Sequence, residues 1–159
     1  MFKRTICKAL LVLFLAVPCS GQNMEFRLHE IGEFRERMGQ TSLVDVDKDG
    51  DLDWVFGCSG EMYWYEYRSS ADWELHEIGK GASTDVGGCP ADINQDGWMD
   101  FIVGDSWYEN THKPRSEKFI LHRKNMISCH DNIYLDIDGD GIKDVVSLSD
   151  HVDHPVLAW

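Results

Sequence analysis

Aspartates recur in one nine-residue pattern at three places along the chain. The pattern has Asp at position 1, Asp or Asn at position 3, Asp at position 5, Gly at position 6 and Asp at position 9. Its copies cover residues 45–53, 92–100 and 136–144, start 47 and 44 residues apart, and are named here the first, second and third aspartate loops. Oxygen atoms at this spacing can converge on one point, which is the chemistry of a calcium site.

Each aspartate loop offers four side chains and one backbone carbonyl to a metal ion. The glycine at position 6 permits the sharp turn, and the carbonyl of position 7 adds to the ligand shell. The predicted ligands are Asp45, Asp47, Asp49, Asp53 and the carbonyl of Asp51; Asp92, Asn94, Asp96, Asp100 and the carbonyl of Trp98; and Asp136, Asp138, Asp140, Asp144 and the carbonyl of Ile142. Crowded carboxylates repel one another without a cation, so we expect up to three Ca²⁺ ions and metal-coupled folding.

The residues after each loop argue against an EF-hand. That motif needs a glutamate at position 12 and a helix on each side. Position 12 is Phe56, Val103 or Ser147 in the three loops, and the flanking segments have the composition of strands. The remaining alternative is an Asp-Gly turn that binds nothing, which three copies in register make improbable.

The segments around the loops predict the β-strands that must position them. Each repeat has a Leu-His pair in an extended segment, a short apolar run after the loop, and then a segment centred on a tryptophan. The recurring residues are His29, His76 and His122, and Trp64, Trp107 and Trp159. Residues that recur at one repeat position usually serve the repeat, so we interpret them as packing residues in preference to ligands or a sugar-stacking platform. No helical period is present outside the N-terminal leader.

A repeat of about 46 residues with three or four short strands is typical of a β-propeller blade. The sequence therefore predicts an all-β fold with blades at about 25–68, 72–111 and 117–159. Closed propellers typically have four to eight blades. Three repeats thus predict an incomplete propeller: part of a longer chain, a truncated product, or a piece that assembles with other chains or with itself.

The loop pattern, followed by an apolar triplet and glycine, resembles the FG-GAP/VCBS repeats of integrin α-chain propellers and of many exported bacterial proteins. The resemblance covers about residues 25–159 and departs from the pattern at Asn94 and at Ser147–Ser149. It implies Ca²⁺ held between strands of a blade. It also implies a secreted, non-catalytic module for cell adhesion, with an extracellular protein or a carbohydrate as partner. The alternative is part of a glycan-active propeller enzyme similar to polysaccharide lyases.

Residues 1–21 predict a secretory signal peptide, which leaves 22–159 as the mature chain. Lys3, Arg4 and Lys8 precede an apolar run at 9–17 that is too short to span a bilayer. We therefore expect a secreted, periplasmic or cell-surface protein. Lipidation at Cys19 is the second interpretation, because Pro18 is a poor fit before a lipidated cysteine. No other stretch is apolar enough for a membrane helix.

The charge excludes one class of partner. The leader carries three positive charges and no negative ones, so its removal takes the formal charge from −13 to −16. Nucleic acid is therefore not an expected partner, since phosphate binding needs a basic surface. Three cysteines remain at positions 58, 89 and 129, an odd number, and a bridge between Cys58 and Cys89 is one option that export would permit.

One further pair, His130-Asp131, precedes the third loop and has no equal counterpart in the first repeat. A His-Asp pair can bind a ligand or do acid–base work, although a solvated turn is the simpler interpretation. No hydrolase, metalloprotease or phosphate-binding motif is present. We therefore favour a binding module over an enzyme.

Overall fold

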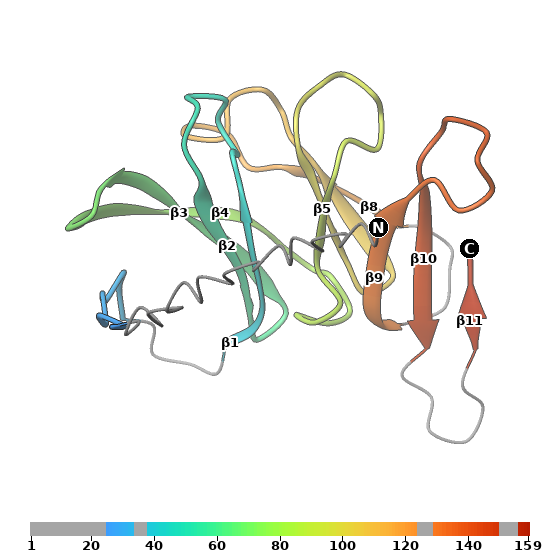
Figure 1. Cartoon of the computed structure of the whole chain (residues 1–159), viewed down its shortest axis with the longest axis horizontal. Coiled ribbons are helices and arrows are strands. Elements are labelled where there is room, and N and C mark those ends of the chain that lie inside the picture. Colours follow the sequence, from blue (N-terminus) through green and yellow to red (C-terminus); the bar gives the residue numbers. More distant parts are fainter. Residues whose placement is uncertain (1–24, 34–37, 124–128, 150–155) are drawn as a thin grey trace, which may run out of the picture.

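The computed structural model describes residues 25–33, 38–123, 129–149 and 156–159. Within these ranges the chain contains eleven β-strands and no helix. The strands form three antiparallel sheets arranged one after another along the molecule (Figure 1). This confirms the predicted all-β class built from repeated sheets. The predicted signal peptide at 1–21 lies outside the described residues.

Each sheet uses strands that follow one another in sequence. The first sheet has the order β1-β2-β3-β4 and contains Met38–Val44, Asp53–Cys58, Glu61–Ser69 and Asp72–Lys80. The second sheet has the order β5-β6-β7-β8 and contains Cys89–Ala91, Asp100–Val103, Ser106–Glu109 and Ile120–Arg123. The third sheet has the order β11-β10-β9 and contains Cys129–Leu135 (β9), Asp144–Ser149 (β10) and Leu157–Ala158 (β11).

The first sheet has large side chains on both of its faces, because successive residues of a strand point to opposite sides. Along β3, Met62 and Trp64 are buried on one face, whereas Tyr63 and Tyr65 lie on the other. A two-residue turn of Ser59 and Gly60, both with positive φ (52° and 80°), joins β2 to β3. Such a turn matches the right-handed twist of the strands and fixes their register.

Every aspartate loop connects the first two strands of its sheet. The residue before each loop pairs with the aspartate at position 9: Val44 with Asp53, Ala91 with Asp100, and Leu135 with Asp144. Each loop is therefore the closed end of a hairpin. Figure 1 shows the three loops at the same end of the sheets.

The strand pairing corrects the predicted limits of the repeats. The sequence placed the Leu-His segments at the start of each unit, at about 72 and 117. In the structure these segments are β4 and β8, which pair with β3 and β7 and so complete the sheet before them. The sheets consequently span 38–80, 89–123 and 129–158. The reason is a side-chain contact: the histidine of each Leu-His pair stacks on the tryptophan of the neighbouring strand, Trp64 with His76 and Trp107 with His122.

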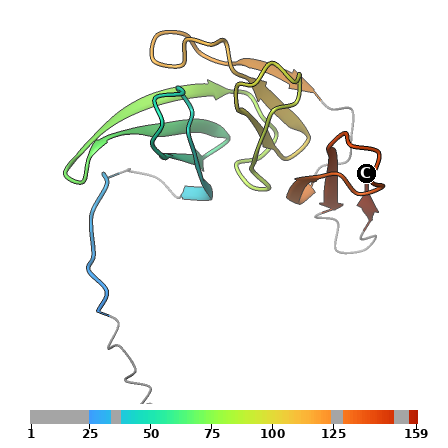
Figure 2. The same ribbon diagram turned by 45° about the horizontal axis from the view of Figure 1, so that its top comes forward.

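The first sheet packs on the second through apolar side chains. Val55, Met62, Trp64 and Ile78 of the first sheet form one buried cluster with Phe101, Val103 and Tyr108 of the second. Trp64 and Met62 have no exposed surface, so burial stabilises this contact by about 2 kcal/mol for each large side chain. Figure 2 shows that the sheets follow one another along a curved path.

The third sheet meets the second through polar groups. Asn132 of β9 donates through Nδ2 to the carbonyl oxygen of Gly87 at 2.6 Å, and its Oδ1 accepts a hydrogen bond from Ser147 Oγ at 2.6 Å. The hydroxyl of Tyr134 donates to the carbonyl oxygen of Asp92 at 2.7 Å. Cys129, also buried, donates through Sγ to the carbonyl oxygen of Gly104 at 2.9 Å. These bonds satisfy buried groups and fix the orientation of the third sheet.

Candidate metal centres

The backbone of the three aspartate loops is held by the same hydrogen bonds. In each loop the glycine amide at position 6 donates to Oδ2 of the aspartate at position 1. The nitrogen–oxygen distances are 3.2 Å for Gly50 and Asp45, 3.0 Å for Gly97 and Asp92, and 2.9 Å for Gly141 and Asp136. Asp45 and Asp92 therefore fix the turn with one of their two oxygens, whereas Asp136 uses both, because its Oδ1 accepts a further bond from the Gly139 amide at 2.7 Å.

Positions 3 and 5 repeat this arrangement along each loop. The amide of position 5 donates to Oδ1 of position 3, with distances of 3.2, 3.1 and 3.1 Å for Asp47, Asn94 and Asp138 as acceptors. The amide of position 7 donates to Oδ1 of position 5, with distances of 3.3, 2.8 and 2.8 Å for Asp49, Asp96 and Asp140. One oxygen of each of these aspartates thus holds the loop and leaves the second for other partners, whereas the single oxygen of Asn94 is already used by the turn.

Two residues of each loop adopt left-handed backbone conformations. Position 4 has φ of 63° at Lys48, 59° at Gln95 and 80° at Gly139, and position 6 is glycine with φ of 84° to 101°. Only glycine adopts this region without steric cost, which is why the pattern requires it at position 6. The turn brings the side chains at positions 1, 3 and 5 to one side.

The aspartate at position 9 anchors the loop to the sheet. Its Oδ2 accepts a hydrogen bond from the amide of position 2 at 2.9 Å for Asp53, 3.0 Å for Asp100 and 3.2 Å for Asp144. In the first two sheets Oδ1 accepts a second bond, from Tyr67 at 3.0 Å or from Asn110 at 2.9 Å. Burial raises the pKa of Asp53 to about 7 despite these two donors, and it also raises the pKa of Asp100.

The carboxylates converge on a point in the first and third loops. Oxygens of Asp45, Asp47 and Asp53 lie within 4.8 Å of one another, and so do oxygens of Asp136, Asp138 and Asp144. In addition, Oδ1 of Asp45 and Oδ1 of Asp92 are buried and accept no hydrogen bond within the described part of the chain. A buried carboxylate oxygen without a donor is costly, and a bound cation would satisfy it.

A guanidinium from the second sheet reaches the first loop. Arg115, in the connection between β7 and β8, places Nη2 2.6 Å from Asp47 Oδ2 and 3.0 Å from Asp49 Oδ2. It also lies 2.9 Å from Glu66 Oε1 on β3. Burial raises the pKa of Asp47, and the positive charge of Arg115 opposes this shift. The first loop therefore carries an internal counter-charge.

The second loop is paired with a histidine and an amide. Nε2 of His112 lies 2.7 Å from Asp96 Oδ2, and the imidazole stacks on the Trp98 ring with centroids 5.1 Å apart. Asn94 donates through Nδ2 to the same oxygen at 2.8 Å. The hydrogen bond from His112 is the main cause of the lowered pKa of Asp96. Asp92, Asp96 and Asp100 form no such cluster of converging acidic oxygens in the described ranges.

The third loop has neither kind of partner. Among the described residues no lysine, arginine or histidine forms an ion pair with Asp136, Asp138, Asp140 or Asp144. Lys143 lies instead over the ring of Tyr134, 5.2 Å from its centroid. In the described part of the chain, backbone amides are the donors to these four carboxylates.

The loop pattern did not reveal the partners that lie far away in the sequence. Arg115 and Asp49 are separated by 66 residues. Asn110 and Val46 are separated by 64 residues, and Nδ2 of Asn110 donates to the carbonyl oxygen of Val46 at 3.0 Å. Glu66 could have been suspected, because Glu66 and Glu109 stand two residues after the recurring tryptophans. The proposed roles of the carbonyls of Asp51, Trp98 and Ile142 stay predictions.

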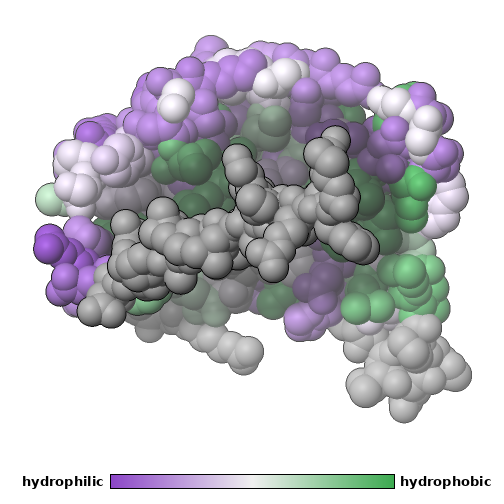
Figure 3. All heavy atoms as spheres, viewed as in Figure 1, coloured by the Kyte–Doolittle hydropathy of each residue, from purple (hydrophilic) through white to green (hydrophobic). Residues whose placement is uncertain are grey.

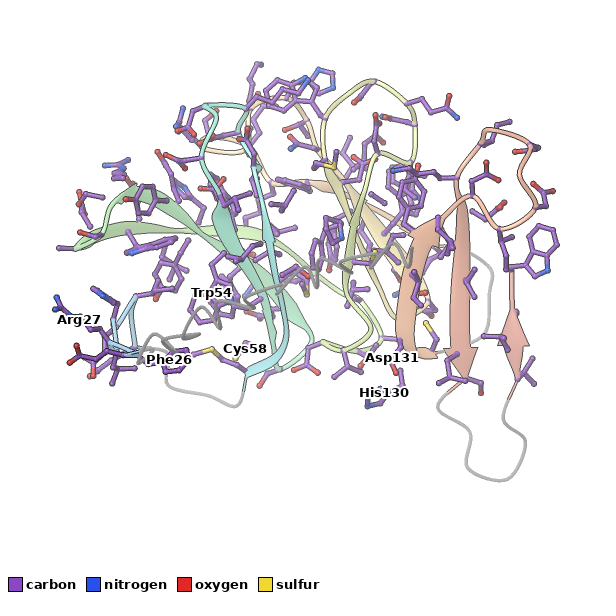
Figure 4. The ribbon with its side chains drawn as sticks, viewed as in Figure 1. Phe26, Arg27, Trp54, Cys58, His130 and Asp131 are labelled. Atoms are coloured by element: carbon purple, nitrogen blue, oxygen red, sulfur yellow. The ribbon has the colours of Figure 1, made fainter. Side chains whose placement is uncertain are left out.

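His130 and Asp131 lie apart from the loops. They occupy the start of β9, at the opposite end of the sheet from the aspartate loops (Figure 4). Their side chains contact each other at 3.0 Å between Nδ1 and Oδ2, and they are 65% and 60% exposed. This pair resembles a solvated surface contact, and its suggested role in ligand binding stays a prediction.

Four of the recurring residues, Trp64, His76, Trp107 and His122, serve the packing of the sheets as the repeat predicted, whereas His29 and Trp159 are exposed. Nε2 of His76 lies 2.9 Å from Glu66 Oε2, and Nε2 of His122 lies 2.6 Å from Glu109 Oε2, while each imidazole stacks on its tryptophan. Trp64 has no exposed surface and cannot stack on a sugar. The suggested bridge between Cys58 and Cys89 is wrong, because no disulfide joins the described cysteines.

Comparison with known proteins finds a family match for part of the chain. No curated protein and no solved structure matches the chain. None of the described residues form a helix that is both long and apolar enough to cross a membrane. Residues 45–103, which include the first two aspartate loops, match the family described as FG-GAP-like repeat. The chain therefore carries FG-GAP-like repeat sequence, as the spacing of its aspartates predicted.

Proposed function

We propose that each aspartate loop binds one Ca²⁺ ion and that the ions stabilise the three sheets of an exported module. The observation that carries this proposal is the hydrogen-bond pattern of the loops. Backbone amides use one oxygen of the side chains at positions 1, 3 and 5, and buried oxygens such as Oδ1 of Asp45 and Asp92 are left without a donor. An ion held by these free oxygens would offset both the repulsion and the cost of burial.

The chemistry of the side chains favours Ca²⁺ over other metals. The ligands within the loop pattern are all oxygens, whereas Zn²⁺ and copper sites usually contain histidine or cysteine. Mg²⁺ demands a smaller, near-octahedral shell, and Ca²⁺ accepts six to eight oxygens in flexible geometry. Clustered carboxylates on a turn fit the second description better.

The module itself is proposed to bind an extracellular protein or a glycan without catalysing a reaction. A cleft between the second and third loops is lined by residues that include Gln95, Met99, Tyr134 and Lys143. It combines apolar, aromatic and cationic groups beside the metal loops, which suits the mixed surface of a sugar or a peptide. Loss of glycan or protein binding in Lys143→Ala, with unchanged thermal stability, would support this role. Turnover of a polysaccharide that is lost in His130→Ala would instead favour the enzyme.

The metal proposal is tested by thermal unfolding of metal-free protein. Adding millimolar Ca²⁺ should raise the melting temperature, since an ion bound only by the folded chain stabilises it. The same concentration of Mg²⁺ should have a much smaller effect. No shift with Ca²⁺, or an equal shift with Mg²⁺, would contradict the proposal.

A further inference from the structure

One buried residue of the second sheet bonds to both the first and the second aspartate loop. Asn110 directly follows β7 and is 1% exposed. Its Nδ2 donates to the carbonyl oxygen of Val46, at position 2 of the first loop, at 3.0 Å, and to that of Met99, at position 8 of the second loop, at 3.2 Å. Its backbone amide donates to Oδ1 of Asp100, at position 9 of the second loop, at 2.9 Å. Asn110 therefore holds groups of two candidate metal centres at once.

These bonds complete a chain between the two aspartates at position 9. The amide of Val46 donates to Asp53 Oδ2 at 2.9 Å, and the carbonyl of the same residue accepts the bond from Asn110. Asp53, Val46, Asn110 and Asp100 are 0%, 2%, 1% and 1% exposed. Each group in such a buried chain depends on its partner, because a lost bond leaves a donor or acceptor unpaired away from water. We therefore expect the positions of Asp53 and Asp100 to depend on each other.

The connection that carries Asn110 contacts the first loop a second time. This connection, residues 110–119 between β7 and β8, lies beside the first loop (Figure 1). Its Arg115 contacts the carboxylates of Asp47 and Asp49 at 2.6 and 3.0 Å. The connection thus bonds to the backbone of the first loop through Asn110 and to its side chains through Arg115.

The first and second loops also meet at the surface. Nζ of Lys48, at position 4 of the first loop, lies 4.8 Å from the centroid of the Trp98 ring, at position 7 of the second loop. Figure 3 shows that this end of the molecule is mainly hydrophilic. A cation–π contact at an exposed site is weak, so it adds little to the buried chain. It nevertheless shows that an indole of the second loop lies where its fluorescence can report on both loops.

The third loop is joined to the second loop in a different way. Tyr134, two positions before the third loop, donates through its hydroxyl to the carbonyl oxygen of Asp92 at 2.7 Å. Ile137, at position 2 of the third loop and thus equivalent to Val46, is 45% exposed. The link that the structure describes between these two loops therefore ends at a backbone carbonyl and does not involve the aspartates at position 9.

We propose that the first and second aspartate loops bind Ca²⁺ cooperatively, with Asn110 as the positioning residue that couples them, and that the third loop binds nearly independently. This rests on the proposed function, because it concerns calcium in the same loops. An ion in the first loop fixes Asp53 and, through Val46 and Asn110, orders Asp100. The second ion then binds to a loop whose ordering cost has already been met, which raises its affinity.

The sign of the effect distinguishes this coupling from long-range electrostatics. Asp49→Ala prevents the first loop from holding its ion and leaves that loop more negative than the calcium-bound loop. Coulomb attraction alone would then make the second loop of this variant bind Ca²⁺ more tightly. Coupling through Asn110 predicts weaker binding instead, because Asp53 and Asp100 are no longer ordered by the first ion.

The proposal is tested by calcium titration of the full chain, followed by the fluorescence of Trp98. The same titration of Trp98→Phe identifies the part of the signal that belongs to the second loop. Asp49→Ala should raise the calcium dissociation constant of the second loop about tenfold, within the range typical of coupled sites. Asp140→Ala removes the same position from the third loop and is the matched control, with an expected change of less than about twofold.

Asn110→Ala tests the positioning residue itself. In this background the second loop should have the same calcium affinity with and without Asp49→Ala, because the chain is broken between Val46 and Asp100. Near-ultraviolet circular dichroism checks that the variant is folded. The comparison of Asp49→Ala with Asp140→Ala changes no core residue, so it decides the question even where Asn110→Ala does not fold.

The outcomes separate the coupling from calcium binding. Equal effects of Asp49→Ala and Asp140→Ala on the second loop would overturn the coupling and leave calcium binding intact. Tighter binding by the second loop in Asp49→Ala would do the same, since it is the electrostatic result. Absence of any saturable calcium signal in the wild-type chain would contradict calcium binding itself, and the coupling with it.

Discussion

The first and third aspartate loops have the same four carboxylate positions and different surroundings. In the first loop, Asp53 is fully buried, and Arg115 lies within 3.0 Å of oxygens of Asp47 and Asp49. In the third loop, Asp144 is only half-buried, and within the described residues no cationic side chain pairs with the carboxylates. The same pattern is thus partly neutralised by an arginine in one sheet, whereas in the other no described cationic side chain offsets its charge.

This difference distinguishes two properties of each loop, the hydrogen bonds that hold its turn and the charge that balances its carboxylates. The hydrogen bonds from the amides to positions 1, 3, 5 and 9 occur in both loops, so they belong to the turn itself. The counter-charge is a property of the neighbouring sheet, because Arg115 comes from the connection between β7 and β8. We therefore expect the loops to share a geometry and to differ in how strongly they depend on calcium.

The first and third loops should differ most in the unfolding free energy that is lost when the aspartate at position 9 is replaced in metal-free protein. Asp53→Ala leaves the amides of Val46 and Tyr67 without an acceptor inside the protein, which should cost about 4 kcal/mol of unfolding free energy. Asp144→Ala removes a single bond of 3.2 Å at a half-buried site and should cost about 1 kcal/mol. Urea unfolding in a chelator measures both. Equal costs would mean that the burial of Asp53 has no energetic consequence.

The raised pKa of Asp53 predicts a pH dependence that calcium should remove. Because the pKa in the folded chain is about 7, above the usual 3.8, the folded state favours the protonated carboxyl. Its contribution is fully present below pH 3.8 and is lost as the pH rises through about 7, by about 4 kcal/mol in total. Metal-free protein should therefore lose stability between pH 5 and pH 8, and Asp53→Asn should flatten this profile. A wild-type profile that rises over this range in the absence of metal would contradict the assignment.

Replacing Arg115 tests the internal counter-charge directly. Arg115→Gln should destabilise the metal-free protein by about 1 kcal/mol, because Asp47, Asp49 and Glu66 lose their common partner. It should also tighten calcium binding at the first loop roughly fivefold, since the ion no longer competes with a cation. Lys113→Gln, in the same connection and with Glu117 as its ion-pair partner among the described residues, is the matched control. Calcium titrations are best made with Asp96→Ala and Asp140→Ala in the background. Unchanged affinity would show that the guanidinium does not compete.

Replacing the histidine beside the second loop should have the smallest effect on the free energy of unfolding. The His112 side chain is about half exposed, and its contacts within the described residues are with Asp96 and the Trp98 ring, so His112→Ala should cost about 0.5 kcal/mol or less. Trp98 lies at position 7 of this loop, and its fluorescence should report the change. A loss comparable to that of Asp53→Ala would place His112 in the core of the site, contrary to its exposure.

The sequence predicted the loops, their turn residues and the all-β class, because these depend on local spacing. The aspartates at positions 1, 3 and 5 and the glycine at position 6 determine the turn, in which positions 4 and 6 have left-handed φ. It did not predict which sheet contains the Leu-His strands. That choice depends on the stacking of His76 on Trp64 and of His122 on Trp107, which is a contact between strands.

The counter-charges could not be predicted for a related reason. Arg115 and Asp49 are 66 residues apart and meet only because the second sheet packs on the first. The apolar core of that contact contains Trp64, Phe101 and Tyr108, none of which belongs to the loop pattern. Electrostatic partners of this kind depend on the packing of whole sheets, and the spacing within a motif does not reveal them.

The most direct test of the calcium proposal is isothermal titration of metal-free protein with Ca²⁺. The wild-type chain should bind three ions, one for each aspartate loop, and Asp49→Ala, Asp96→Ala and Asp140→Ala should each abolish or strongly weaken one of them. The loss in Asp140→Ala should be the most severe, because no cationic side chain in the described structure replaces the ion there. Absence of saturable binding, or a stoichiometry that none of the three substitutions changes, would contradict the account.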